Sequence, residues 1–570
     1  MALATLQTQF PNRALGFSAT PVHASSTGFE DIRFVSVAFN PSILNYPDKN
    51  MSPYGPEISS VYNLTKLALT YLNPGNPDNP LSNIVMPGDM VVLKPNLVST
   101  SGFAKEGCTR TPVLRPLVDF SVEAGASKII IAEGPSSPDP ADVVFGPEYS
   151  NVTGLVEALQ EMYPSVNITY KNLNQDEFTW VDLGENSTFH GAYTANQLYS
   201  LNNISMDEDS YYYAEDCNGY DPKGYRPGLY AIANTVFEAD VFINVPKMKV
   251  HHLTGVTLSL KNLVGITVSS TGNTTNEENI KDIPHWNNTA AHPENLTRQD
   301  SFENDVLWRI MSDLNKIVLY TDKNGVPKSD KQRKYLSVVD GVIGMEGPTV
   351  YNPPGIPRPT GAIVAGQDPI AVDAVCCRVM GFNFTVLKSV VNAGQLFDQP
   401  IGKADPAVIC ALGTSLNSTT FGESYVPHIN YEDSQIAPYK IRLQYFDPPE
   451  AVLIVTDPET PTEDVETKVV VYPENMSLVA AGWLSYSLDG AEPITIKMVP
   501  SGETLVGNLG LLEAGTTVSY EVCLQDYFFN TDWSALAQAE VIFEFPQFLI
   551  LPLFMIATLL AWLHVKSRKA

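Results

Sequence analysis

Short apolar runs that end in a charged or amide side chain most constrain the fold of this 570-residue chain. The clearest run is Val241–Val245, whose sequence VFINV predicts a buried β-strand. Similar runs occupy Phe34–Ala38, Met90–Leu93 and Lys128–Ala132, with a helix expected between the last two. Strands that alternate with helices are typical of parallel sheets. The sequence therefore predicts an α/β domain over residues 30–445, with a mainly parallel sheet and flanking helices, after an N-terminal extension over residues 1–29.

A basic segment follows the strand Val241–Val245 in an otherwise acidic chain. The chain has 63 acidic and 35 basic residues, and its formal net charge is −28. No carboxylate lies between Asp240 and Glu277, and this window contains Lys247, Lys249, His251, His252 and Lys261. A local positive potential of this kind favours an anionic ligand. The alternative is a solvated basic strand end in which one histidine is satisfied by local hydrogen bonds.

The segment from Val245 to Leu263, which contains PKMKVHH followed by GVTLSLKNL, resembles the signature of the family 362 domain of unknown function (DUF362). The resemblance covers about residues 30–440 and includes Val91–Asn96, Ile129–Gly134, Val338–Gly341 and Gly366–Asp373. It implies a fold and leaves the reaction open. Some relatives carry an iron–sulfur module with repeated CxxC spacing. The six cysteines here lack that spacing, so an iron–sulfur cluster is unlikely, and no other cofactor or metal is assigned.

Polar residues at the predicted strand ends complete the candidate site. Lys94 lies at a strand end, where open α/β sheets bind ligands, and Arg110 precedes a helix start, which suits a carboxylate or phosphate. The alternatives are a turn role for Asn96 and an ion pair between Glu133 and one of these cations. The candidate ligand-binding residues are Lys94, Asn96, Thr109, Arg110, Thr111, Glu133, Lys247, Lys249, Thr257, Asn262, Asp340, Glu346 and Asp368. The candidate catalytic residues are His251, His252 and Lys261.

Three further expectations concern element boundaries. The strand Tyr335–Val339 is expected to end at Asp340, with Glu346 in a glycine-rich turn, so these two carboxylates are either cation ligands, a general base or ordinary turn residues. Asp368 is most simply a helix N-cap, because Pro369 suits the first helical position. Pro116 is expected to delay the helix that follows Arg110 until Leu114.

Short alternating strands after residue 445 resemble a fibronectin-type or immunoglobulin-like sandwich, predicted over residues 446–543. The apolar run Phe548–Val565 is long enough to span a membrane, and a transmembrane helix is predicted over residues 546–565. The basic tail over residues 566–570 places the C-terminus in the cytoplasm and the body outside the cell. This ending resembles the anchors of archaeal surface proteins. The alternative is a buried amphipathic C-terminal helix.

Glycosylation sequons agree with an extracellular body, since Asn-X-Ser/Thr occurs at Asn50, Asn63, Asn151, Asn167, Asn186, Asn203, Asn273, Asn287, Asn295, Asn383, Asn417 and Asn475. No signal peptide is visible in Met1–Phe39, which leaves a tail-anchored protein with a cytoplasmic body as the alternative. The strong acidity argues against nucleic acid as a partner, because the phosphate backbone is also negative.

Two functions are expected for the basic segment. The first is an enzyme that acts on a small anionic metabolite, with lysines and Arg110 holding the anion and a histidine as acid or base. The TRTP segment with His251, Gly255 and Lys261 is faintly similar to nickel-pincer lactate racemase, without that enzyme's glycine-rich stretch before the lysine. This similarity implies a hydroxy or carboxylic acid as substrate. The second function is a non-catalytic surface receptor for an anionic ligand or a glycan.

Overall fold

The computed structural model describes residues 32–46, 60–97, 107–135, 151–190, 228–251, 254–268, 307–351, 354–421, 423–427 and 441–542. The chain forms two compact units. The first comprises Met1–Pro448 and Gln525–Asp532, and the second comprises Pro449–Leu524 and Trp533–Ala570. The sequence prediction placed one change of fold at residues 445–446, and nothing in the sequence indicated that residues 525–532 group with the first unit.

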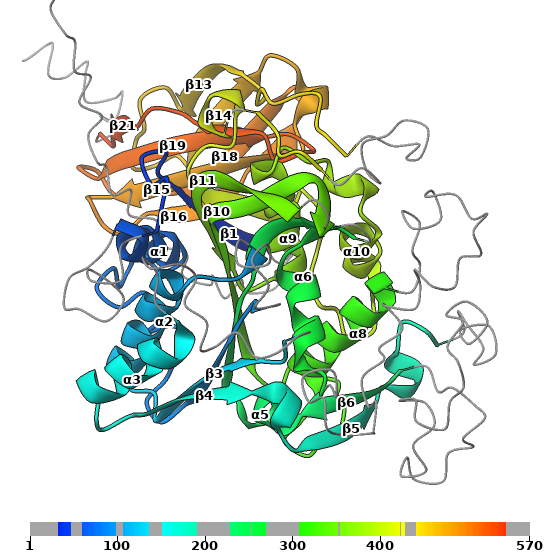
Figure 1. Ribbon diagram of the computed structural model, residues 1–570. Coiled ribbons are helices and arrows are strands. Elements are labelled where there is room, and N and C mark those ends of the chain that lie inside the picture. Colours follow the sequence, from blue (N-terminus) through cyan, green and yellow to red (C-terminus); the bar gives the residue numbers. More distant parts are fainter. Residues whose placement is uncertain are drawn as a thin grey trace, which may run out of the picture. The chain divides into compact units, whose positions relative to one another are not determined.

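A ten-stranded sheet forms the centre of the first unit (Figure 1). Its strand order is β12-β1-β11-β10-β7-β2-β3-β4, and β8 pairs with both β10 and β9. The strands are β1 Arg33–Phe39, β2 Met90–Pro95, β3 Lys128–Glu133, β4 Asn167–Asn172, β7 Val241–Val245, β8 Lys247–His251, β9 Gly255–Thr257, β10 Lys334–Tyr351, β11 Pro354–Gly366 and β12 Ile409–Gly413. A separate antiparallel pair consists of β5 Phe178–Asp182 and β6 Leu229–Ala233.

The sheet is mixed, whereas the sequence predicted a mainly parallel one. Strands β10, β7, β2, β3 and β4 run parallel to one another as expected. Strand β11, however, runs antiparallel to both β10 and β1. The long β10–β11 hairpin was missed because β10 continues through Asp340 and Gly341, which resemble a strand end in the sequence. A register shift between Gly341 and Ile343 lets the pairing with β11 continue, so Glu346 also lies within a strand and not in a turn.

Helices cover both faces of this sheet (Figure 1): α1, α2 and α3 lie on one side, and α6, α8, α9 and α10 lie on the other. The helices are α1 Ser60–Leu72, α2 Thr111–Glu123, α3 Val152–Met162, α5 Asn234–Glu238, α6 Ser259–Asn262, α8 Leu307–Tyr320, α9 Pro369–Val379, α10 Lys388–Val391 and α11 Ser418–Phe421, with a 3₁₀ turn at Leu263–Ile266. Helix α2 begins at Thr111 and contains Pro116, so the predicted start at Leu114 is wrong. Pro116 lies close enough to the helix start that its missing N–H removes only the bond to the Pro112 carbonyl.

The predicted strand before the basic segment is confirmed as β7, and its five residues are all buried. Strand β8 continues in the same direction after Pro246 and pairs with β10, so that Lys247 lies opposite Asp340. The parallel strands β2, β3 and β7 end at one edge of the sheet, and β8 and the second half of β10 extend beyond that edge. This arrangement brings the candidate polar residues to the carboxyl-terminal edge, as expected for an α/β sheet.

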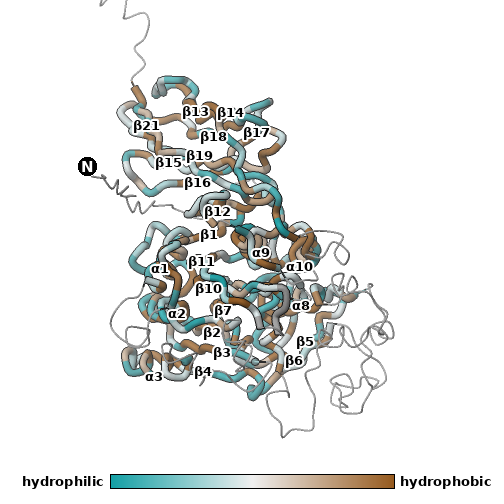
Figure 2. The backbone as a smooth tube through the Cα atoms, turned by 45° about the horizontal axis from the view of Figure 1, so that its top comes forward, coloured by the Kyte–Doolittle hydropathy of each residue, from teal (hydrophilic) through white to brown (hydrophobic). Residues whose placement is uncertain are grey.

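The second unit consists of antiparallel sheets. One has the order β13-β14-β18-β17 and the other β16-β15-β19-β20, with β21 paired to β19. The strands are β13 Ala451–Asp457, β14 Thr467–Pro473, β15 Ala481–Leu488, β16 Ile494–Lys497, β17 Val499–Ser501, β18 Thr504–Gly510, β19 Thr517–Gln525 and β21 Ala537–Glu540, while two of the three residues of β20 Thr531–Trp533 are grouped with the first unit. Hydrophilic and hydrophobic stretches are mixed along these strands (Figure 2), and their buried side chains form a separate core around Val469, Leu484, Leu505 and Val522.

Within the part of the chain that the structure describes, no helix is long and apolar enough to cross a membrane. The predicted N-terminal extension over residues 1–29, the predicted transmembrane helix over residues 546–565 and the basic tail over residues 566–570 lie outside the described residues.

Candidate functional site

Lys94 and Glu133 form a buried ion pair at the ends of β2 and β3. The Lys94 Nζ lies 2.7 Å from Glu133 Oε1, and the two side chains are 1% and 5% exposed. Glu133 also accepts hydrogen bonds from the backbone N–H of Leu97 and of Gly134, each at 2.8 Å. Burial lowers the pKa of Lys94, and the charge of Glu133 counteracts that shift. Of the two roles that the sequence left open for Glu133, the structure shows the ion pair.

Lys247 and Asp340 form a second ion pair with no exposed side-chain surface. The Lys247 Nζ lies 2.9 Å from Asp340 Oδ2. Tyr46 closes a triangle, because its hydroxyl accepts from Lys247 Nζ at 2.6 Å and donates to Asp340 Oδ1 at 2.7 Å. The backbone N–H of Arg110 donates to Asp340 at 3.0 Å. Both charges are therefore satisfied internally, and we do not assign Lys247 or Asp340 to contact with a ligand.

Lys249 lies at the start of a chain of buried amides. Its Nζ donates to Asn96 Oδ1 at 3.1 Å and to the Gly107 carbonyl at 2.9 Å. Asn96 donates to Asn262 Oδ1 at 2.8 Å, and Asn262 in turn donates to Asn244 Oδ1 at 2.7 Å. No carboxylate among the described residues forms an ion pair with Lys249. Burial lowers the pKa of Lys249 to about 8, against opposing effects of Cys108 and Glu133.

Lys261 projects from the short helix α6 into the same group of cations. Burial around its amine lowers the pKa of Lys261 to about 7, and the positive charges of Lys249 and Lys94 lower it further in the same direction. The residue itself remains partly exposed. Among the described residues, no carboxylate or hydrogen-bond acceptor pairs with its side chain. Among the described residues, Glu133 is therefore the one carboxylate that pairs with any of Lys94, Lys249 and Lys261.

Side chains from four elements hold helix α6 in place. Asp373 on α9 accepts from the backbone N–H groups of Ser259 and Leu260, at 2.7 and 3.1 Å. The Ser259 hydroxyl lies 2.6 Å from that of Ser337 on β10. Asn244 on β7 and Asn315 on α8 donate to the carbonyls of Ser259 and Leu260, at 2.8 and 3.1 Å. The position of Lys261 is therefore set by the packed core and not by a free loop.

Gly265 lies one turn beyond Lys261 and fits against the Lys94–Glu133 pair. A Cβ added to Gly265 would collide with Glu133 Oε1 and lie 3.0 Å from Lys94 Nζ. Only glycine therefore lets the segment after α6 approach the ion pair this closely.

The remaining predicted residues occupy varied settings. Thr257 is 2% exposed, and its hydroxyl has no hydrogen-bond partner among the described residues. Thr109 joins two strand ends, since its hydroxyl donates to the Val245 carbonyl at 2.6 Å and accepts from the Asn96 N–H at 2.9 Å. Thr111 is buried at the start of α2. The Arg110 guanidinium lies over the Tyr46 ring, 5.6 Å from its centroid.

His251 is buried at the end of β8, with its Nδ1 3.2 Å from the Thr254 hydroxyl, and His252 lies outside the described residues. The carboxylates of Glu346 and Asp368 have structural partners. Glu346 accepts from the Val426 N–H at 3.0 Å. Asp368 is confirmed as the N-cap of α9, because it accepts from the N–H groups of Ile370 and Ala371. Its other oxygen, Oδ2, pairs with Arg33 Nε at 3.1 Å.

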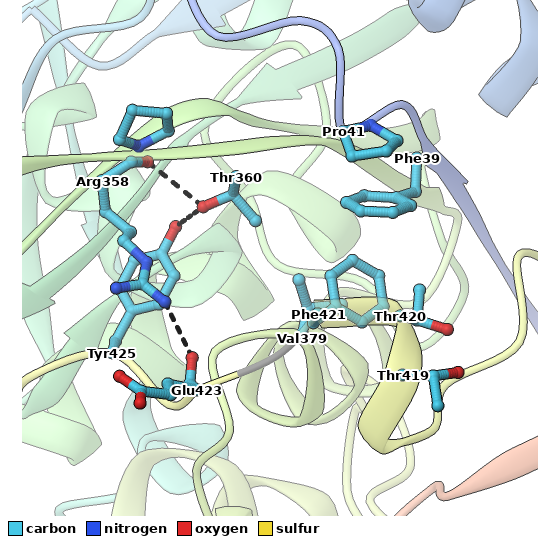
Figure 3. Close-up of a pocket in the computed structure, with 11 residues that line it drawn as sticks. Phe39, Pro41, Arg358, Thr360, Val379, Thr419, Thr420, Phe421, Glu423 and Tyr425 are labelled. Carbon is cyan, nitrogen blue, oxygen red and sulfur yellow. Dashed lines mark hydrogen bonds between the residues drawn. The ribbon is translucent and has the colours of Figure 1, made fainter. Parts of the chain in front are cut away.

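A cavity of about 290 Å³ lies elsewhere in the first unit (Figure 3). Phe39 and Phe421 line one side of it, with ring centroids 4.7 Å apart. Arg358, Thr360 and Tyr425 line the other, where Arg358 donates to the Glu423 carbonyl at 2.9 Å. None of the candidate site residues contributes to its walls. The residues that the structure describes include no group of three or more His, Cys, Asp or Glu side chains able to hold a metal ion.

Residues 204–378 match the family model of DUF362, described as a domain of unknown function. This match supports the DUF362 identification. The matched segment contains Lys249, Thr257, Lys261, Asn262 and the α9 residue Asp373, whereas Lys94, Asn96 and Glu133 lie before it. No curated protein matches the chain.

Solved structures share only weak similarity with this chain. A β-1,2-glucanase from Parabacteroides distasonis is 16% identical over 18% of this chain and 15% of that chain, with a TM-score of 0.12. A cycloalternan-forming enzyme from Listeria monocytogenes, in complex with a pentasaccharide substrate, is 16% identical over 17% of this chain and 9% of that chain, with a TM-score of 0.13. An engineered protein is 10% identical over 86% of this chain and 98% of that chain, with a TM-score of 0.13. Scores this low carry no argument about fold or function.

Proposed function

We propose that this chain is a membrane-anchored cell-surface protein of the DUF362 type that binds a small anion, a carboxylic or hydroxy acid, beside α6. One observation supports the anion above all. The positive charge of Lys94 contributes to lowering the pKa of Lys249, and the charges of Lys249 and Lys94 contribute to lowering the pKa of Lys261, while Glu133 is the one carboxylate among the described residues that pairs with any of the three. An anionic ligand would relieve this repulsion.

Two residues are proposed to contact the anion directly. Lys261 has no acceptor among the described residues, so its ammonium is available. Lys249 gives two of its three N–H donors to Asn96 and Gly107, which leaves one for a ligand. The proposed membrane anchor and extracellular location rest on the apolar run Phe548–Val565 and its basic tail.

Calorimetric titration of the purified full-length protein with lactate and with propionate tests the binding. Lys261→Gln removes one positive charge from the group and is expected to lower the affinity by at least about tenfold, the value of a lost charged hydrogen bond. Its melting temperature should hardly change, because a repelling cation contributes little to stability. Lys334→Gln is the matched control, since Lys334 is exposed near the opposite end of β10. Equal affinities in the Lys261 and Lys334 variants would contradict the proposed site.

Consumption of lactate, or the appearance of an oxidised or reduced product during incubation, would favour an enzyme. Binding of lactate without turnover would favour a receptor. Extraction of the membrane fraction with alkaline carbonate tests the anchor. The full chain should stay with the lipid, and its release into the soluble fraction would contradict the predicted span.

A further inference from the structure

Lys261 differs from the other lysines of the cluster in how its amine is held. Lys94 is bound to Glu133, and Lys249 donates to two fixed acceptors. Lys261 has neither kind of partner among the described residues, although α6 itself is fixed by Asp373, Ser337, Asn244 and Asn315. The result is an unattached amine on a rigidly placed backbone, next to two further cations. Desolvation and neighbouring cations are the two conditions that turn a lysine into a nucleophile.

We infer that Lys261 forms an imine with the carbonyl carbon of a small 2-oxo acid, whose carboxylate is held by Lys249 and Thr257. This inference rests on the proposed binding of a small carboxylic acid at the same place and names its chemical class more closely.

The carboxylate contacts come from two neighbouring strands. Lys249 on β8 lies directly opposite Thr257 on β9, and side chains of directly opposed residues point to the same face. The Thr257 hydroxyl is buried without a partner among the described residues, and a buried hydroxyl is costly unless it is hydrogen-bonded. One carboxylate oxygen can accept from Thr257 and the other from the remaining N–H of Lys249. A 2-oxo acid carries its carbonyl carbon next to that carboxylate.

The chemical step balances with one proton from the solvent. The neutral amine of Lys261 adds to the carbonyl carbon, so that a C–N bond forms and the C=O π bond breaks. The proton released from nitrogen passes to the oxygen, which gives a carbinolamine. That oxygen takes one more proton from the solvent and leaves as water, which gives the protonated imine. The Lys261 nitrogen then carries one positive charge, so the ligand's carboxylate faces a cation.

The surrounding charges favour a neutral amine before the reaction. Burial and the charges of Lys249 and Lys94 lower the pKa of Lys261 to about 7, so about half of the amine is neutral at pH 7. Of the neighbouring groups, Glu133 pairs with Lys94 and Cys108 lies near Lys249. An ordinary exposed lysine, with a pKa near ~10.4, is less than about 0.1% neutral at the same pH.

Reductive trapping tests this inference. Full-length protein is incubated with pyruvate and cyanoborohydride, and the adduct is located by mass spectrometry of the intact chain and of its peptides. We expect one adduct with the mass of pyruvic acid less one oxygen atom, on the peptide that contains Lys261. Its rate should rise about tenfold from pH 6 to pH 8 and then level, whereas surface lysines gain about tenfold per pH unit over the whole range.

Lys261→Arg keeps the charge but cannot form an imine, so the adduct on the peptide that contains residue 261 should disappear. Lys334→Arg is the matched control and should label as the unmodified protein does. Trapping on Lys249 in place of Lys261, or undiminished labelling of Lys261→Arg, would overturn the inference. If propionate binds and pyruvate is never trapped, the imine is wrong and the proposed binding function stands. If a natively folded protein binds neither acid, both proposals fail.

Discussion

The carboxylate of Asp373 accepts a hydrogen bond from the backbone N–H of Ser259 at 2.7 Å, although 114 positions separate the two residues in sequence. This bond and its partner to Leu260 fix the start of α6, two residues before Lys261. Asp373 therefore acts as a positioning residue for the cationic cluster. It is itself fully buried within α9, where burial raises the pKa of its carboxyl to about 7.

Asp373→Asn is expected to show a destabilisation that depends on pH. The folded pKa of about 7 lies above the ordinary value near ~3.9, so the folded protein binds more protons than the unfolded chain between these limits. Stability from this group is therefore fully present below about pH 4 and is lost as the pH rises towards 7. Urea unfolding should show the largest cost of Asp373→Asn at about pH 4 and below, and a cost that shrinks by about 1.4 kcal/mol per pH unit from there up to pH 7. A cost that grows with pH would contradict the raised pKa.

Lys247 and Asp340 should behave as a structural pair. Lys247→Met leaves a buried carboxylate without its cation and is expected to cost about 3–5 kcal/mol of unfolding free energy. Asp340→Asn should cost a similar amount, because it leaves the buried Lys247 ammonium without a carboxylate partner. The double variant should cost clearly less than the sum of the two, which urea unfolding of all four proteins would measure. Additive costs would mean that the contact at 2.9 Å contributes nothing.

The sequence could predict the strands of this site better than its contacts. Val241–Val245 and Lys247–His251 were recognisable because apolar runs and period-two spacing are local properties. The contacts of Lys247 with Asp340 and Tyr46 were not recognisable in the sequence, because these residues lie 93 and 201 positions away from Lys247. Asp340 also resembled a turn residue, because an Asp-Gly pair is a turn signal unless a register shift carries the strand past it.

Other residues of the site carried signals that become clear only in three dimensions. Asn244 interrupts an apolar strand, and a buried amide must find partners, which here are Asn262, Ser259 and Tyr335. Asp373 lies about one turn into helix α9, and nothing in the neighbouring sequence indicates that its carboxylate binds the N–H groups at the start of helix α6. Gly265 follows the motif by two residues, and the reason for a glycine there is its close approach to Glu133 at the end of β3.

Gly265→Ala is expected to disturb both stability and binding. The added methyl group would overlap the Glu133 carboxylate and push it from Lys94, and both are buried, so the cost should be about 2–4 kcal/mol. Gly502→Ala is the control, because nothing lies near its Cβ position and only its φ of +63° is strained. That strain alone should cost about 1 kcal/mol. If thermal unfolding shows equal losses for the two variants, the close approach of Gly265 to the ion pair is not important.

The affinity for propionate should fall as the pH rises from 6 to 9. Anion binding needs charged ammonium groups, and the pKa of Lys261 is lowered to about 7 and that of Lys249 to about 8. Above each pKa the charged fraction drops about tenfold per pH unit, so calorimetric affinity should begin to fall near pH 7 and fall more steeply above pH 8. Lys261→Arg stays charged throughout this range, and its affinity should remain level until the pH approaches 8, where Lys249 loses its proton. An affinity that is constant from pH 6 to 9 in both proteins would show that neither lysine contacts the anion.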